Sequence, residues 1–214
     1  MLDGAEVAFK AGDTTLGQSR LELAAVMGAN DPAILLHGGD IALTNHLALY
    51  ALERFYLPAL PLTQPQDPLG AEVRAHTALA YYAGAADPGA GPFLDAQHQL
   101  NPEADLVALA LARYKIFNGD LLAASTDLKM LTTQQPDNPA VLLISGDWYL
   151  AQGQLAEAQQ RYEQVRDAKP GQGPLAPPWV RREADCNLRR MHDLGQNIKL
   201  EPTCEDLPSL VIGR

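Results

Sequence analysis

Residues 139–172 read PAVLLISGDWYLAQGQLAEAQQRYEQVRDAKPGQ. In both halves of this stretch the apolar residues return every three or four positions, which is the spacing of one helix face. Gly153 lies between the halves, where glycine tolerates the positive φ angle of a tight turn. Pro170 follows the second half, and proline ends a helix because its nitrogen has no hydrogen to donate. The stretch therefore predicts two helices joined by a short turn.

The same pattern returns along the chain at a fixed interval, with matching residues 34 positions apart. A fixed period of this length is the signature of a repeat architecture. Several columns of small, apolar, glycine and proline residues share the period, which is hard to obtain by chance. These columns are Pro102/Pro136/Pro170, Gly119/Gly153, Ala90/Ala124/Ala158, Ala78/Ala112/Gly146 and Leu94/Leu128/Tyr162.

Five copies fit the period, and they differ in how well they match. The copy at 139–172 matches best, those at 105–138 and 71–104 match progressively less well, and those at about 1–31 and 32–70 are looser. Gly12 marks the turn of the first copy. In the copy at 32–70 the small, small and aromatic positions are taken by Gly39, Ala51 and Phe55.

With this period and these columns the chain resembles the tetratricopeptide repeat (TPR) family, most clearly over residues 71–172. The resemblance implies an all-α fold, a right-handed superhelix of helix pairs over residues 1–172. A linker and a C-terminal capping helix are expected over 173–194, and an irregular tail over 195–214. An extended connection is expected over residues 59–70, because four prolines crowd this region: Pro58, Pro61, Pro65 and Pro68.

The expected capping helix has one apolar stripe with arginines beside it. We expect the stripe to face the last repeat and the charged residues to face solvent, as in the terminal unit of a solenoid. The stripe consists of Val180, Ala184, Leu188 and Met191.

Composition narrows the class of protein. The 33 alanines and 34 leucines among 214 residues favour helix over strand. A formal net charge of −10 argues against a nucleic-acid partner, because phosphate binding needs a basic face. No apolar stretch is long enough for a transmembrane segment. The repeat phase places Met1 inside a helix, so we expect a preceding segment in a longer protein.

Two cysteines, Cys186 and Cys204, leave the compartment open. A disulfide between them would pin the tail and would fit the extracytoplasmic part of an anchored or exported protein. Two thiols would fit a cytoplasmic protein. The N-terminus lacks the basic and apolar regions of a signal peptide.

The sequence predicts no catalytic site, no metal site and no cofactor. The five histidines are scattered without metal-ligand spacing, and the glycine motifs of nucleotide-binding sites and hydrolases are absent. One group, His37, Asp40 and His46, would support a hydrolase or transferase if the three side chains met in an open cleft.

The TPR resemblance implies a concave groove lined by the first helix of each repeat. Arg113 and Asp147 are expected to face each other there, and the groove lacks the lysines and asparagines of chaperone-docking TPR domains. An apolar or amphipathic peptide would fit it, and the alternatives are the protein's own tail or a second copy. The expected lining residues are Tyr82, Leu106, Leu109, Arg113, Ile116, Phe117, Leu143, Asp147 and Leu150.

These patterns favour a non-catalytic scaffold or adaptor that binds a partner protein or peptide through the groove. The alternative is a non-catalytic domain of a larger membrane-associated or enzyme complex. The third hypothesis, a hydrolase or transferase, depends on the cleft near His37.

Overall fold

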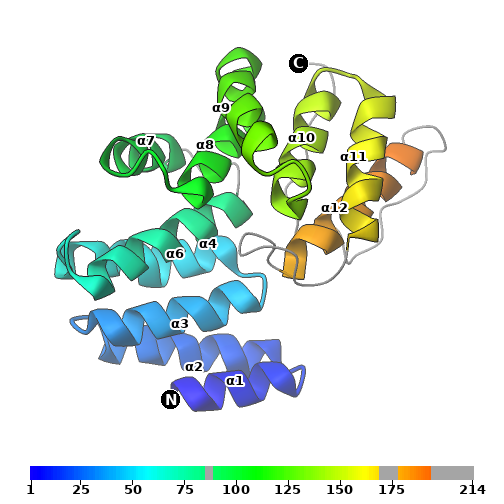
Figure 1. The fold of residues 1–214 in the computed structure, drawn as a ribbon. Helices are drawn as coiled ribbons and strands as arrows, with labels where there is room; N and C mark the ends of the chain where they lie inside the picture. The colour runs from blue at the N-terminus through cyan, green and yellow to red at the C-terminus, as the bar shows by residue number, and fades with distance from the viewer. Residues whose placement is uncertain (85–88, 169–177, 194–214) are drawn as a thin grey trace. The chain divides into compact units, whose positions relative to one another are not determined.

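A computed structural model describes residues 1–84, 89–168 and 178–193 (Figure 1). Throughout these ranges the regular structure is helical and there is no strand, which confirms the all-α prediction. None of the helices in the described ranges has both the length and the apolar character needed to cross a bilayer. The chain divides into two compact units, Met1–Gly84 and Ala85–Arg214. Their boundary falls inside the repeat expected at 71–104.

The first unit consists of helices that follow one another closely along the chain. α2 and α3 both begin at an aspartate whose carboxylate accepts backbone N–H groups of the first turn, Asp13 for α2 and Asp31 for α3. α1 packs against α2, and α3 packs against the π-helical turn η1. The elements are α1 (Leu2–Lys10), α2 (Thr14–Met27), α3 (Pro32–Thr44), α4 (Ala48–Ala51), η1 (Leu52–Tyr56), α5 (Leu57–Ala59), the 3-10 turn η2 (Leu60–Leu62) and α6 (Pro68–Gly84).

The prediction of an extended connection over residues 59–70 was wrong at both ends. Helical structure continues through Pro58 and Pro61 to Leu62, and α6 starts at Pro68. Pro68 is the first residue of α6, where its missing N–H group would have no partner in any case. Pro58 and Pro61 lie within continuous helical structure, just after the points where the helix type changes. The π-helical turn that precedes Pro58 ends the regular α-helical ladder. Within the expected connection, only residues 63–67 lie outside helical segments.

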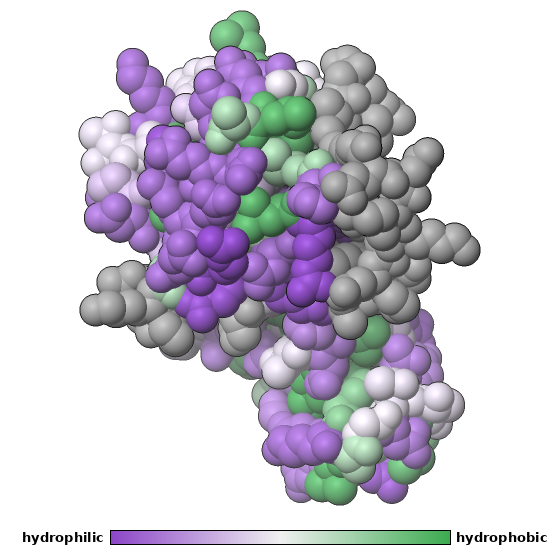
Figure 2. All heavy atoms as spheres, turned by 90° about the vertical axis from the view of Figure 1, so that its right-hand side faces the viewer, coloured by the Kyte–Doolittle hydropathy of each residue, from purple (hydrophilic) through white to green (hydrophobic). Residues whose placement is uncertain are grey.

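The second unit repeats the helix-turn-helix arrangement. α8 packs against α9, α10 packs against α11, and α12 packs against both α11 and α10. α12 is found where the capping helix was expected, whereas residues 195–214 and most of the expected linker lie outside the described residues. On the side where α11 lies in Figure 1, hydrophobic residues form small patches among hydrophilic ones (Figure 2). The helices are α7 (Ala90–Leu100), α8 (Asp105–Phe117), α9 (Leu121–Gln134), α10 (Pro139–Ala151), α11 (Leu155–Asp167) and α12 (Pro178–Asp193).

Four residues with positive φ angles mark equivalent turns between helices. Gly119 and Gly153 have φ values of +81° and +75°, and Gly12 has +80°. His46 has a φ of 64° and stands 34 positions after Gly12, as Gly153 stands 34 positions after Gly119. His46 therefore occupies the turn-glycine position of the copy at 32–70, which gives it a structural explanation.

A second repeated contact joins a glycine of one helix to a tyrosine ring of the next. A Cβ atom on Gly39 would lie 2.4 Å from the Tyr56 ring, and one on Gly146 would lie 2.5 Å from the Tyr162 ring. Both approaches are too close for any side chain larger than hydrogen. The sequence pattern paired Gly39 with Phe55, but the π-helical turn adds a residue and brings Tyr56 to that place.

Substitutions at two of these turn positions should change the free energy of unfolding in opposite directions. Gly153→Ala should lower the free energy of unfolding by about 1 kcal/mol, because a Cβ atom there meets open space and only the backbone is strained. His46→Gly should raise it by about 0.5–1 kcal/mol, because the left-handed conformation then carries no penalty. Urea unfolding followed by circular dichroism measures both. Equal signs for the two variants would contradict the equivalence of the turns.

Candidate functional site

The groove expected in the second unit is not an open surface in this structure. Six of its eight predicted residues there are buried, and Leu106 and Phe117 are half-buried. Tyr82, the predicted groove residue of the first unit, is also fully buried. The six buried residues are Leu109, Arg113, Ile116, Leu143, Asp147 and Leu150.

Helix α12 supplies side chains that surround Arg113. Arg113 of α8 is fully buried and forms an ion pair with Glu183 of α12, which is also buried. Its Nε atom lies 3.8 Å from Oδ2 of Asp147 in α10, which confirms the expected facing pair. The guanidinium also lies over the rings of Phe117 and Trp179, 5.5 and 5.8 Å from their centroids. One buried cation therefore holds three helices together.

The two carboxylates beside Arg113 differ in their further partners. Oδ1 of Asp147 accepts hydrogen bonds from the Tyr162 hydroxyl, at 2.8 Å, and from Asn187 of α12, at 3.2 Å. Burial raises the pKa of Asp147, and it raises the pKa of Glu183 to about 7, although the charge of Arg113 acts in the opposite direction. The carboxylates need Arg113, because an isolated buried charge is expensive.

These contacts correct the expected character of α12. Val180 and Ala184 of the apolar stripe are buried, as predicted. Glu183 and Asn187 are buried as well, although the sequence pattern placed charged residues of this helix toward solvent. A polar residue on an inner helix face gives no periodic signal in the sequence. The burial of Glu183 is explained only by its contact with Arg113, which stands 70 positions earlier.

Removing the buried cation should destabilise the second unit strongly. Arg113→Met removes the cation that pairs with both Asp147 and Glu183 and should cost about 3–5 kcal/mol. Adding Glu183→Gln to that variant should recover part of the loss. Chemical denaturation measures both, with Arg166→Met as the matched control, since Arg166 forms an exposed pair with Asp167 that contributes at most about 1 kcal/mol. An equal cost for the two methionine variants would contradict the network.

The first unit has an open pocket between α1 and α3. Its volume is about 330 Å³. His37 and Asp40 both line it, as the third functional hypothesis required, but His46 does not. The sequence reasoning did not include the residues that α1 contributes. Glu6 stands 34 positions before Asp40, and this spacing could have indicated it. The lining residues are Glu6, Phe9, Lys10, His37, Asp40, Ile41, Thr44 and Asn45.

Asp40 is held by two side chains from later elements. Its Oδ1 atom accepts a hydrogen bond from the Tyr56 hydroxyl at 2.8 Å and lies 2.5 Å from Nδ1 of His76 in α6. The His76 ring also meets the Tyr56 ring edge to face, with 6.2 Å between the centroids. The hydrogen bond to Asp40 raises the pKa of His76, against the opposing effect of partial burial.

The arrangement around Asp40 recurs around Asp147. In both places a Gly-Asp dipeptide on one helix meets a tyrosine of the next helix: the glycine contacts the ring, and the aspartate accepts from the hydroxyl. In both places the same oxygen, Oδ1, also meets a side chain from a later helix, His76 or Asn187. We call this arrangement the Gly-Asp–Tyr clamp. Its occurrence at a buried position favours a structural role for Asp40 over a catalytic one.

One of the two cysteines lies in the described part of the chain, which can also be searched for metal-binding groups. Cys186 is buried in α12 and is disulfide-bonded, whereas Cys204 lies outside the described residues. Within residues 1–84, 89–168 and 178–193 no three histidine, cysteine, aspartate or glutamate side chains are grouped so that they could hold a metal ion.

Comparison with family models, curated proteins and solved structures gave no match.

The contact between His76 and Asp40 predicts a change in titration. Asp40→Asn should lower the pKa of His76 toward the ordinary value of about 6.5. The pair should stabilise the fold fully below about pH 6.5 and lose this contribution as the pH rises through the raised pKa. NMR titration of the His76 ring measures the change. Asp3→Asn, an exposed substitution on α1, is the control, and an unchanged His76 titration in Asp40→Asn would contradict the contact.

Proposed function

We propose that the chain is a non-catalytic helical-repeat scaffold of the TPR type that binds a peptide segment of a partner protein. In this proposal its helix pairs stack into a right-handed superhelix that α12 caps. The observation that carries the proposal is the recurrence of one helix-turn-helix unit. Its left-handed turn residues stand 34 positions apart in both units, and its Gly-Asp–Tyr clamp occurs in both.

The pocket between α1 and α3 is the proposed binding surface. In the second unit, the predicted groove residues hold α12 and are buried. In the first unit, the corresponding repeat position, counted back from the turn residue, carries Glu6 and Asp40, and both line an open pocket. TPR proteins bind partners with this set of positions, so the resemblance and the open pocket support the same surface.

The pocket favours a peptide in which a basic side chain lies near an apolar one. Phe9 and Ile41 give it an apolar part, and Glu6 and Asp40 give it two carboxylates. Lys10 pairs with Glu6 at 3.4 Å, but both side chains are exposed, and such pairs are easily replaced. The first unit carries nine acidic residues against four lysines and arginines, so its field also attracts a basic segment.

This proposal assigns Asp40 no catalytic role. Its Oδ1 atom is engaged by Tyr56 and His76, and the equivalent oxygen of Asp147 makes the same kind of contacts where no substrate reaches it. A non-catalytic domain within a larger complex would use the same surface, because the partner would then be a subunit of that complex.

Charge reversal at the pocket tests the proposal. Peptides selected against the chain from a random library displayed on phage should pair a lysine or arginine with an aliphatic or aromatic residue. Glu6→Lys should weaken their binding roughly tenfold, which corresponds to about 1.4 kcal/mol, because it replaces an attraction by a repulsion. Isothermal titration calorimetry measures the affinity.

Glu53→Lys is the matched control, because it makes the same charge change at an exposed position of η1. Binding that falls equally in both variants would reflect only net charge and would contradict a specific pocket. Selection of acidic or purely apolar peptides would also contradict it.

A further inference from the structure

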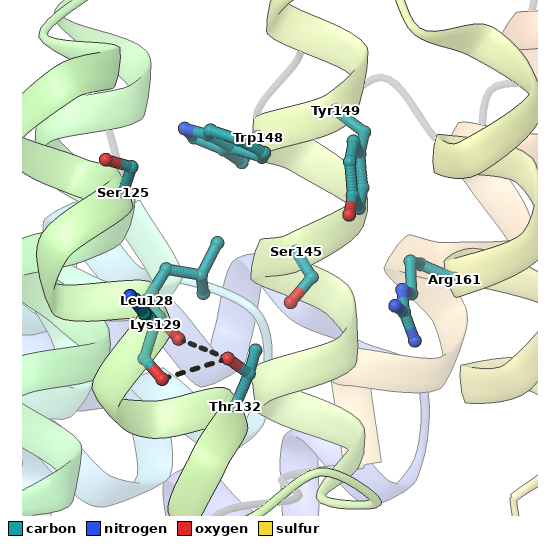
Figure 3. Close-up of a pocket in the computed structure, with 8 residues that line it drawn as sticks. All are labelled: Ser125, Leu128, Lys129, Thr132, Ser145, Trp148, Tyr149 and Arg161. Atoms are coloured by element: carbon teal, nitrogen blue, oxygen red, sulfur yellow. Dashed lines mark hydrogen bonds between the residues drawn. The ribbon is translucent and has the colours of Figure 1, made fainter.

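The second unit contains a pocket that the proposed function does not use. It lies among α9, α10 and α11 and has a volume of about 350 Å³ (Figure 3). This volume is at the lower end of the range for ligand pockets, about 300–1,000 Å³. Its lining comes from three helices, and α10 packs against both of the others, so the walls are fixed by the fold.

The pocket is basic although the chain is acidic. Lys129 of α9 and Arg161 of α11 both line it, and none of its lining residues is acidic. Neither cation forms an ion pair with a carboxylate in the described part of the chain, and the Arg161 guanidinium donates to the Gln164 side chain, at 3.1 Å. In a chain with a net charge of −10, two cations without an acidic partner in one pocket indicate a site for an anion.

The rest of the wall is aromatic and aliphatic. Trp148 and Tyr149 of α10 meet edge to face with 5.2 Å between their centroids. The Trp148 indole donates to the Leu121 carbonyl at 3.0 Å, which fixes the plane of its ring. Figure 3 shows the Leu128 side chain extending from α9 toward Ser145 of α10. This surface is suited to an apolar or aromatic group beside the anion.

The serine and threonine hydroxyls of the pocket leave recognition of the anion to its other donors. Ser125, Thr132 and Ser145 each donate their hydroxyl hydrogen to a backbone carbonyl of their own helix. A hydroxyl has only one hydrogen to donate, so these groups face the pocket as acceptors. The donors that remain for an anion belong to Lys129, Arg161 and the Tyr149 hydroxyl.

The pocket has the length of a short peptide segment. Along α9 it runs from Ser125 to Thr132, which at 1.5 Å per residue is about 10 Å. An extended chain covers this distance with about three residues. We propose that the pocket binds an extended acidic segment of a partner protein in which aspartates or glutamates flank an aromatic residue. The carboxylates contact Lys129 and Arg161, and the aromatic ring packs on Trp148 and Tyr149.

Two blocked tripeptides test this proposal. N-acetyl-Asp-Phe-Asp-amide should cause a saturable shift of the Trp148 indole N–H signal in NMR spectra, and N-acetyl-Asn-Phe-Asn-amide should not. The signal is assigned by its disappearance in Trp148→Phe. Lys129→Gln and Arg161→Gln should each weaken the acidic peptide roughly fivefold, because each removes one charged contact.

Arg166→Gln is the matched control, since it removes an exposed arginine of the same helix outside the pocket, and binding should stay unchanged. Three results would overturn the proposal: no shift up to the solubility limit of the acidic peptide, equal affinity for the amide peptide, or the same saturable shift with inorganic phosphate alone. Glu6→Lys should not alter the Trp148 response, so failure here is distinguishable from failure of the pocket in the first unit.

Discussion

The contact between a glycine on one helix and a tyrosine ring on the next determines how closely the helix pairs can pack. At Gly39 and Gly146 the ring lies where a Cβ atom would otherwise be. This approach also brings the tyrosine hydroxyl to the neighbouring aspartate, Asp40 or Asp147. A buried phenol needs a hydrogen-bond partner, so the glycine and the aspartate act together. A larger residue at either glycine would displace the ring and break the hydrogen bond.

The aspartate then extends the pair to the following helix. Once its Oδ1 atom is fixed by the tyrosine, it offers a defined acceptor to a side chain from the next layer, His76 in the first unit and Asn187 in the second. In the second unit Arg113 and Glu183 complete the cluster, and both are buried with Asp147. Such a cluster is sensitive to geometry, because buried charges are tolerated only when they are paired. It therefore selects one placement of α12.

Much of the fold could be predicted from the sequence because the repeat leaves a periodic record. The repeat period located the turns at Gly119 and Gly153 and the helices on either side, and the apolar stripe of residues 180–191 located the helix now labelled α12. The π-helical turn at Leu52–Tyr56 could not be predicted, because one inserted residue shifts the phase without changing composition. Pro58 and Pro61, which suggested an extended segment, lie instead where the continuous helix changes from π to α and from α to 3-10 geometry.

The candidate sites were harder to predict, because burial depends on which elements meet. The contact between Arg113 and Asp147 could be predicted, because the two residues are separated by one repeat period. That α12 covers them depends on Glu183 and Asn187, which look like surface residues in a sequence. His37 and Asp40 do share a pocket, but the aspartate's partner is His76, which comes from another helix. Contacts of this kind have no local sequence signal.

One repeat position pairs differently in the two units, one of which has an open pocket while the corresponding face of the other is filled. In the second unit this position carries Arg113 and, one repeat later, Asp147, and the opposite charges approach to 3.8 Å where both side chains are buried. In the first unit it carries Glu6 and Asp40, which have the same charge. Two carboxylates cannot neutralise each other, and here each has a partner of its own, Lys10 for Glu6 and His76 for Asp40. Opposite charges at this position therefore join α8 to α10 directly in the second unit, whereas the like charges at the same position of the first unit do not pair with each other.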